Sequence, residues 1–331
     1  MIKVGINGLG RIGRAALKII ESNPNIEIGA INDLIPTENL AYLLKHDSVY
    51  GRYNKKIEST DKSLVIEGKS IPVSSEKEPE NIPWKENGVE IVLECTGVFT
   101  QRDQLERHFK SGAKWVYLSA PAKSDDVVTV VHGVNQPDIN EHKVISCASC
   151  TTNCITPVVE ILSRRIGVKK ASMNTIHAYT SSQGIVDSPS KKVRRGRAGA
   201  VNLVPTSTGA AKATTKVLTN MKDRFDGVAV RVPVPVGSIT DIVFITEKDT
   251  SVEEVNSILK EESQSKRYKG IVEVTEEELV STDIIKNPAA TIIDLSMNQV
   301  IDGDMVRIMA WYDNEWGYAN QMVREVERLN Q

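Results

Sequence analysis

Residues 149–154, Ser-Cys-Thr-Thr-Asn-Cys, carry the side chains best suited to nucleophilic chemistry. They follow a predicted strand over residues 143–146 and precede a predicted helix over residues 151–165. Cys150 should therefore lie at a helix N-terminus, where the helix dipole favours a thiolate and predicts a pKa below the ordinary value of about 8.5. A small buried cysteine is the non-functional alternative. Zinc is disfavoured, because C-x₂-C-x₃-C has no second pair and no neighbouring histidine.

A thiol nucleophile needs a base, and His177 is the strongest candidate because it ends a predicted strand over residues 173–177. The other four histidines have no comparable strand-end position in the second half of the chain; they are His46, His108, His132 and His142. Taken alone, His177 is more simply interpreted as a hydrogen-bonded core histidine. Together, Cys150 and His177 have the composition of a nucleophile and its activating base.

A second motif lies at the N-terminus, where Gly8, Gly10 and Gly13 form the pattern G-x-G-x-x-G. The pattern alone is weak, but here it follows a predicted strand and opens a predicted helix over residues 12–21. In that setting it predicts a dinucleotide site, with the pyrophosphate at the helix N-terminus. Asp33 lies 20 residues past Gly13, at the end of the next predicted strand. Its carboxylate should bind the adenosine ribose and disfavour the 2′-phosphate of NADP; a structural turn with a surface aspartate is the alternative.

The elements that must hold these residues fall into two patterns. Strands alternate with helices over the first 150 residues, which predicts a Rossmann-type doubly wound parallel sheet. The second half predicts an α+β catalytic domain with a mostly antiparallel sheet. We therefore expect a NAD-binding domain over residues 1–149, completed by a C-terminal helix over residues 315–331, and a catalytic domain over residues 150–314.

Composition restricts the possible functions. The chain has 331 residues and a formal net charge of -2, so neither nucleic acid nor an acidic surface is needed as a partner. There is no run of 18 apolar residues and no signal-peptide pattern, and three of the four cysteines lie within eight residues. This composition favours a cytoplasmic protein without a disulfide framework, a membrane span or a metal site.

The motifs together resemble the phosphorylating glyceraldehyde-3-phosphate dehydrogenases over essentially the whole chain. The resemblance rests on residues 4–14, 94–97, 148–154, 177–180, 207–212, 231–233 and 311–318. It implies that Cys150 attacks the aldehyde of glyceraldehyde 3-phosphate while His177 takes the proton. NAD would receive the hydride, and inorganic phosphate would attack the thioester to give 1,3-bisphosphoglycerate. It also implies a homotetramer.

The resemblance assigns binding residues as well. The cofactor set is Asn7, Gly8, Gly10, Arg11, Ile12, Asp33, Thr96, Gly97, Ser119, Asn314 and Tyr318, with Asn314 on the nicotinamide carboxamide. The substrate-phosphate and attacking-phosphate set is Ser149, Thr151, Thr180, Arg195, Thr208, Gly209 and Arg231. Hydroxyls, a glycine N–H and arginines are suitable partners for phosphate oxygens.

The chain departs from the family pattern at several places, among them Cys147 and residues 179–183. Residues 233–238, Pro-Val-Pro-Val-Gly-Ser, replace the usual Pro-Thr-Pro-Asn, and no function follows from the change. Ser188 stands where many NAD-specific members have leucine, so NAD should be preferred with weak use of NADP. The nearest alternative activity is that of erythrose-4-phosphate dehydrogenase, which hydrolyses its thioester. A binding protein without catalysis is a further alternative; it would not need Cys150, His177 and Asn314.

Overall fold

The computed structural model describes residues 1–330, which form two compact units. Unit 1 contains residues 1–130 and 136–148 and the chain from Met322 on, and unit 2 contains residues 131–135 and 149–321. No helix within residues 1–330 has the length and apolar character needed to cross a membrane.

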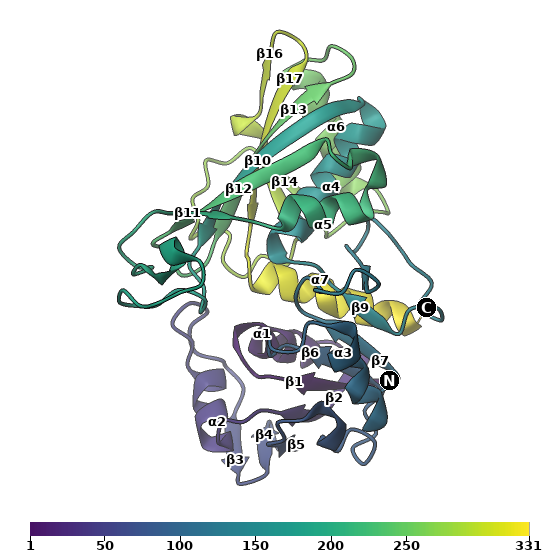
Figure 1. Ribbon diagram of the computed structural model, residues 1–331, viewed down its shortest axis with the longest axis vertical. Coiled ribbons are helices and arrows are strands. Elements are labelled where there is room, and N and C mark those ends of the chain that lie inside the picture. The colour runs from purple at the N-terminus through teal and green to yellow at the C-terminus, as the bar shows by residue number, and fades with distance from the viewer. Residues whose placement is uncertain (331) are drawn as a thin grey trace. The chain divides into compact units, whose positions relative to one another are not determined.

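Unit 1 is built on a sheet with the strand order β3-β4-β5-β2-β1-β6-β7-β9-β8 (Figure 1). Its parallel strands are β1 (Ile2–Asn7), β2 (Ile26–Asn32), β6 (Ile91–Glu94), β7 (Trp115–Leu118), β8 (Val128–Thr129) and β9 (Val144–Ser146). An antiparallel extension of β3 (Ile57–Thr60), β4 (Ser63–Ile66) and β5 (Lys69–Ser74) joins it through β5, which pairs with β2 in parallel.

Helices cover both faces of the parallel sheet. The register places Ile6 opposite Leu93 on one face, and Gly13 of α1 (Arg11–Ile20) packs against Ile6 there. Val92 and Val116 point to the other face, because side chains alternate along a strand, and α3 (Arg102–Lys110) packs there. A further helix, α2 (Thr37–Lys45), follows β2. This is the doubly wound arrangement predicted from the sequence.

Unit 2 contains a sheet with the order β11-β12-β10-β13-β17-β15-β14, and β16 pairs with β17. The strands are β10 (Val168–Ala178), β11 (Val204–Ser207), β12 (Phe225–Val232), β13 (Ser238–Thr246), β14 (Val272–Thr275), β15 (Thr291–Asp294), β16 (Gln299–Ile301) and β17 (Met305–Tyr312). Antiparallel pairs predominate, with parallel pairing only in β10–β12 and β14–β15 among the described residues.

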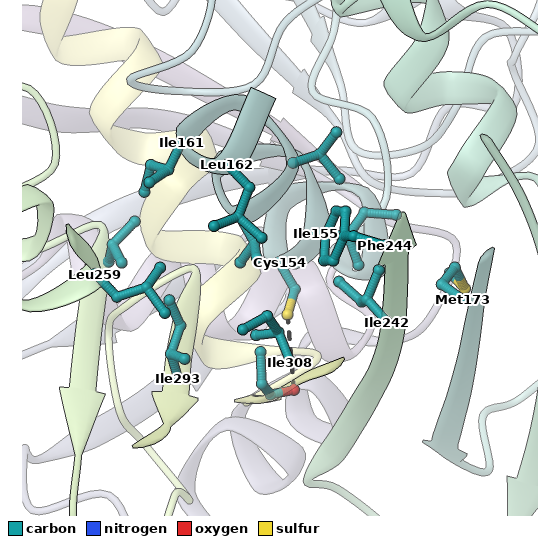
Figure 2. Packing of buried hydrophobic residues seen from close by; sticks show 14 of the residues in the cluster. Cys154, Ile155, Ile161, Leu162, Met173, Ile242, Phe244, Leu259, Ile293 and Ile308 are labelled. Atoms are coloured by element: carbon teal, nitrogen blue, oxygen red, sulfur yellow. Dashed lines mark hydrogen bonds between the residues drawn. The ribbon is translucent and has the colours of Figure 1, made fainter. Parts of the chain in front are cut away.

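Three helices, α4 (Cys150–Arg165), α5 (Ala210–Val217) and α6 (Val252–Gln264), lie against one face of this sheet (Figure 1). Figure 2 shows the side chains of Cys154, Ile155 and Leu162 from α4 packed among those of Phe244 and Ile308 from the strands. Every residue of α4 from Thr151 to Leu162 is buried. A helix buried on all sides cannot shift easily, so Cys150 starts from a rigid element.

The last helix, α7 (Trp316–Glu327), contributes residues to both units. Short 3₁₀ turns occupy Pro79–Asn81, Val193–Gly196, Thr219–Met221, Leu295–Met297 and Arg328–Asn330.

The predicted fold class is confirmed, and the predicted helix over residues 151–165 begins one residue earlier. The strand predicted over residues 129–131 is wrong at its end, because β8 stops at Thr129. Periodicity alone also did not indicate the β3–β5 extension or the parallel pairing of β10 with β12.

Gly13 tests the packing of α1 on β1. A Cβ at Gly13 would lie 2.1 Å from the carbonyl oxygen of Gly8, whereas a Cβ at Gly10 meets no atom within 4 Å. Gly13→Ala should lower the free energy of unfolding by about 2 kcal/mol or more, because backbone must move. In urea unfolding of the ligand-free protein, Gly10→Ala should match wild type. Equal stability of the two variants would contradict this packing.

Candidate active site

Unit 1 contains a pocket of about 350 Å³ where β1, β2 and β6 end. Five residues of the predicted cofactor set line it, namely Asn7, Gly8, Gly10, Asp33 and Thr96. The others in this unit lie outside the lining; they are Arg11, Ile12, Gly97 and Ser119. Nη1 of Arg11 instead pairs with Oδ2 of Asp47 at 2.7 Å.

The glycine loop at this pocket has the features that a dinucleotide requires. Gly8 has a φ of +91°, and a Cβ there would meet the backbone of Thr96 at 2.8 Å. No side chain caps the N-terminus of α1 at Gly10, and a helix N-terminus favours an anion. Asp33 accepts hydrogen bonds from the N–H of Leu9 at 2.6 Å and of Ile35 at 3.0 Å. A carboxylate with two such bonds retains acceptor capacity for ribose hydroxyls.

Behind the pocket lies a buried carboxylate that the sequence analysis did not single out. Glu94 is completely buried, and every group facing it is a donor. Oε1 accepts from the N–H of Thr96 at 2.8 Å and from its hydroxyl, and Oε2 accepts from Nδ2 of Asn7 at 2.6 Å. Asn7 in turn accepts from Asn32 at 2.9 Å. Glu94 therefore joins the ends of β1, β2 and β6, which carry the pocket.

His108 completes this network in a single tautomer. Nε1 of Trp84 lies 3.0 Å from Nδ1 of His108, and an indole N–H only donates, so Nδ1 must be the acceptor. The proton is then on Nε2, which donates to Oε2 of Glu94 at 3.2 Å. His108 is fully buried on α3. The position of Glu94 at a strand end was the sequence signal that could have indicated this network. Its partner His108, and Trp84 behind His108, lie on other segments of the chain.

In unit 2, Cys150 is the first residue of α4 and is partly exposed. Ser149 is the N-cap, and its hydroxyl oxygen accepts from the N–H of Thr152 at 3.1 Å. The hydroxyl of Thr151 bonds that of Tyr312 at 2.8 Å. Two residues predicted to bind phosphate, Ser149 and Thr151, thus use their hydroxyls within the protein.

His177 lies next to Cys150, with 3.4 Å between Nε2 and Sγ. Parallel pairing of β10 with β12 places Arg231 beside His177, and Nη1 of Arg231 lies 2.7 Å from Nδ1. The same Nη1 donates to the carbonyl of Ala178 at 2.8 Å. Because guanidinium only donates, Nδ1 accepts and Nε2 carries the proton that faces the sulfur. The base role predicted for His177 requires the other tautomer, with Nδ1–H donating to Ala178 O at 2.7 Å.

Burial determines the protonation of this pair. Desolvation, followed by the charge of Arg231, lowers the pKa of His177 to about 3, so the imidazole is neutral at physiological pH. Desolvation raises the pKa of the Cys150 thiol, and Arg231 and the hydroxyl of Thr151 oppose the rise. The lowered pKa predicted for Cys150 is therefore wrong for the ligand-free chain, because burial outweighs the helix N-terminus.

Positive charge converges beside His177. Burial lowers the pKa of Arg231, with the charge of Arg195 adding to the effect, and Nε of Arg231 is buried without a hydrogen-bond partner among residues 1–330. Nε of Arg195 donates to the hydroxyl of Thr206 at 2.9 Å. Lys192, not predicted for this site, donates to the hydroxyl of Ser207 at 2.8 Å. Cations with incomplete solvation and a free donor suit a phosphate group.

The remaining predicted residues are also in unit 2. Gly209 is the N-cap of α5, and the hydroxyl of Thr208 accepts from the N–H of Ala210 at 3.2 Å. Thr180 shares a hydrogen bond of 2.8 Å with Ser182. Asn314 is buried, and Tyr318 is buried within α7.

Within residues 1–330, no cluster of three His, Cys, Asp or Glu side chains could hold a metal ion.

Comparison with known proteins agrees with this geometry. Residues 2–102 match the NAD-binding domain of glyceraldehyde 3-phosphate dehydrogenase, and residues 149–314 match its C-terminal domain. The glyceraldehyde-3-phosphate dehydrogenase of Streptomyces coelicolor is 48% identical over 97% of this chain and 96% of its own. That of Thermotoga maritima is 48% identical over 99% of both chains, and that of Geobacillus stearothermophilus 47% over 97% and 96%.

The fold and the matched domains thus define an NAD-dependent oxidoreductase. The chain belongs to the glyceraldehyde-3-phosphate dehydrogenase family.

Glu94→Gln tests the buried network. The new amide NH₂ would face groups that donate to the carboxylate in the wild-type network, so the free energy of unfolding should fall by about 2–4 kcal/mol. NAD binding should weaken as well, because Asn7 and Thr96 lose their anchor. Urea unfolding and calorimetric titration with NAD measure the two effects. The control is Glu90→Gln, which changes a half-exposed carboxylate just before β6 that pairs with Lys114. It should stay within about 0.5 kcal/mol of wild type, as for a surface ion pair; an equal result for both variants contradicts the network.

Alkylation of the ligand-free protein by iodoacetamide tests the state of Cys150. Only the thiolate reacts, and its pKa is raised, so the rate should still climb at pH 9. No inflection should occur near pH 6.5, because the pKa of His177 is about 3. In Arg231→Ala, the plot of alkylation rate against pH should shift by about one unit toward higher pH, because the thiolate loses a neighbouring cation.

Arg231→Lys, which keeps the charge, is the control and should resemble wild type. A wild-type inflection between pH 6 and 7 that disappears in His177→Asn would show that His177 titrates in the ordinary range.

Proposed function

We propose that this protein oxidises D-glyceraldehyde 3-phosphate with NAD and inorganic phosphate to 1,3-bisphosphoglycerate. The observation that carries the proposal is the contact of 3.4 Å between Sγ of Cys150, at the start of α4, and Nε2 of His177. Arg231 beside this pair supplies a cation for the phosphate of the substrate.

The sulfur of Cys150 attacks the aldehyde carbon, the C=O π bond breaks, and the thiol proton passes to the carbonyl oxygen, which becomes the hydroxyl of a hemithioacetal. Nε2–H of His177 donates to that oxygen as its charge develops. When the substrate phosphate engages Arg231, Nδ1 of His177 is released. Nε2 then gives its proton to water and Nδ1 takes one from water, so that Nδ1–H donates to the carbonyl of Ala178, which lies 2.7 Å away. Nε2 then becomes an acceptor for the hydroxyl proton as the hydride leaves. NAD, when bound, supplies the hydride acceptor.

The product of this step is a thioester on Cys150. An oxygen of inorganic phosphate attacks its carbonyl carbon, the C–S bond breaks, and the thiolate returns with release of the acyl phosphate. Arg195, Thr208 and Gly209 are the proposed ligands of the attacking phosphate. The N–H groups at the start of α5 and the hydrogen bond of Arg195 to Thr206 support this proposal.

The pocket in unit 1 supports NAD as the preferred cofactor, with weak use of NADP. Gly8, Gly10 and Asp33 would hold the dinucleotide, and the carboxylate of Asp33 disfavours a 2′-phosphate. Asn7 and Thr96 line the same pocket.

We also propose a cytoplasmic homotetramer. Apolar side chains are exposed in residues 185–203, including Ile185 at 89%, Val193 at 82% and Leu203 at 69%. Val228 on β12 is 56% exposed and Ile301 on β16 is 55% exposed. Burying such side chains against other copies of the chain would remove them from water. None of the four cysteines forms a disulfide, as in a reducing compartment.

Absorbance at 340 nm tests the proposal, with glyceraldehyde 3-phosphate and NAD in the presence and absence of inorganic phosphate. Sustained reduction should require phosphate. Cys150→Ser should lower kcat by about 10³-fold or more, because a neutral hydroxyl is a far weaker nucleophile than a thiolate.

Reduction that is independent of phosphate, or that occurs only with erythrose 4-phosphate, would assign the hydrolysing activity instead. That result would also remove Arg195 and Thr208 from a phosphate site. A purified protein with no turnover on either aldehyde would favour a binding role.

A further inference from the structure

The hydrogen bonds of Asn314 lead into the segment that departs from the family pattern. Oδ1 of Asn314 accepts from the backbone N–H of Gly237 at 3.1 Å and from the hydroxyl of Ser238 at 3.0 Å. Ser238 in turn accepts from the N–H of Ala178 at 3.1 Å. Ser238 and Asn314 are 1% and 5% exposed. The chain of bonds thus runs from the residue after His177 to the side chain of Asn314.

These bonds determine which way the amide of Asn314 points. A backbone N–H can only donate, so the atom facing Gly237 is the carbonyl oxygen. The hydroxyl of Ser238 already accepts from Ala178, and its one proton is directed at the same oxygen. With Oδ1 held twice, Nδ2 faces away, and within residues 1–330 no hydrogen bond engages it.

The backbone conformation of Gly237, which directs its N–H to Asn314, suits glycine. Its φ is +88°, a conformation that residues with a Cβ rarely adopt. A Cβ there would lie 2.5 Å from the carbonyl oxygen of Ser281. A side chain at this position would strain the turn that presents the backbone N–H to Oδ1 of Asn314.

We propose that Gly237 and Ser238 are positioning residues that fix Asn314 as a hydrogen-bond donor to the carboxamide oxygen of the nicotinamide. Ser238 also ties this donor to the end of β10, which carries His177. The inference rests on the proposed function, because it takes NAD as the ligand of Asn314. It gives a role to the last two residues of the departing segment 233–238.

Calorimetric binding of NAD and of ADP-ribose, which lacks the nicotinamide, tests the proposal without turnover. Ser238→Ala removes the proton directed at Oδ1 and leaves the amide free to turn. NAD binding should weaken about tenfold, as for the loss of one buried hydrogen bond, with ADP-ribose affinity unchanged within about twofold. Ser238→Thr keeps the hydroxyl and should bind NAD like wild type.

Asn314→Asp provides a second variant that keeps the fold. Its carboxylate still accepts from Gly237 and Ser238 but has no donor in place of Nδ2, so NAD binding should weaken about tenfold or more while ADP-ribose binding persists. In an Asn314→Ala background, Ser238→Ala should have no further effect on NAD affinity, because the two residues act through one contact.

Three results would overturn the proposal. They are wild-type NAD affinity in Ser238→Ala, an equal loss of NAD and ADP-ribose affinity, and additive effects of the two alanine substitutions. If wild type binds NAD as expected but shows no phosphate-dependent reduction at 340 nm, the proposed function fails while the positioning role of Ser238 stands.

Discussion

The parallel pairing of β10 with β12 is the constraint on which the catalytic arrangement depends. It places His177 beside Arg231, and the two donors on Nη1 then reach both Nδ1 and the carbonyl of Ala178. That contact sets the tautomer of His177. It therefore sets whether Nε2 faces Cys150 with or without a proton. A shift of one residue in this register would turn either side chain to the opposite face of the sheet.

Each unit contains buried polar groups whose partners leave only one arrangement. Glu94 faces four donors, so it serves as an acceptor that holds Asn7 and Thr96 at the edge of the pocket. Oδ1 of Asn314 faces two donors, so its amide has one orientation. Networks of this kind are costly when any partner is missing, and they therefore define a single geometry when complete.

The ligand-free site is electrostatically incomplete. Arg231 and Arg195 have lost hydration, Nε of Arg231 lacks a partner, and burial holds the thiol of Cys150 in its neutral form. A phosphate group would satisfy the arginines and draw Arg231 from His177. Substrate binding and activation of the histidine are then linked through one side chain.

The sequence by itself determined the fold class, the glycine loop with Asp33, and the pairing of a helix-start cysteine with a strand-end histidine. These features depend on local periodicity and on residue type at the ends of elements, which a chain displays directly. The tertiary structure decided what depends on contacts between distant segments. Trp84, His108 and Glu94 meet only after α3 packs on the sheet, and Gly237, Ser238 and Asn314 meet only through the loops at the ends of β12, β13 and β17. It also reversed the pKa shift predicted for Cys150, because the desolvation of a thiol depends on everything packed around it and not on its position in a helix.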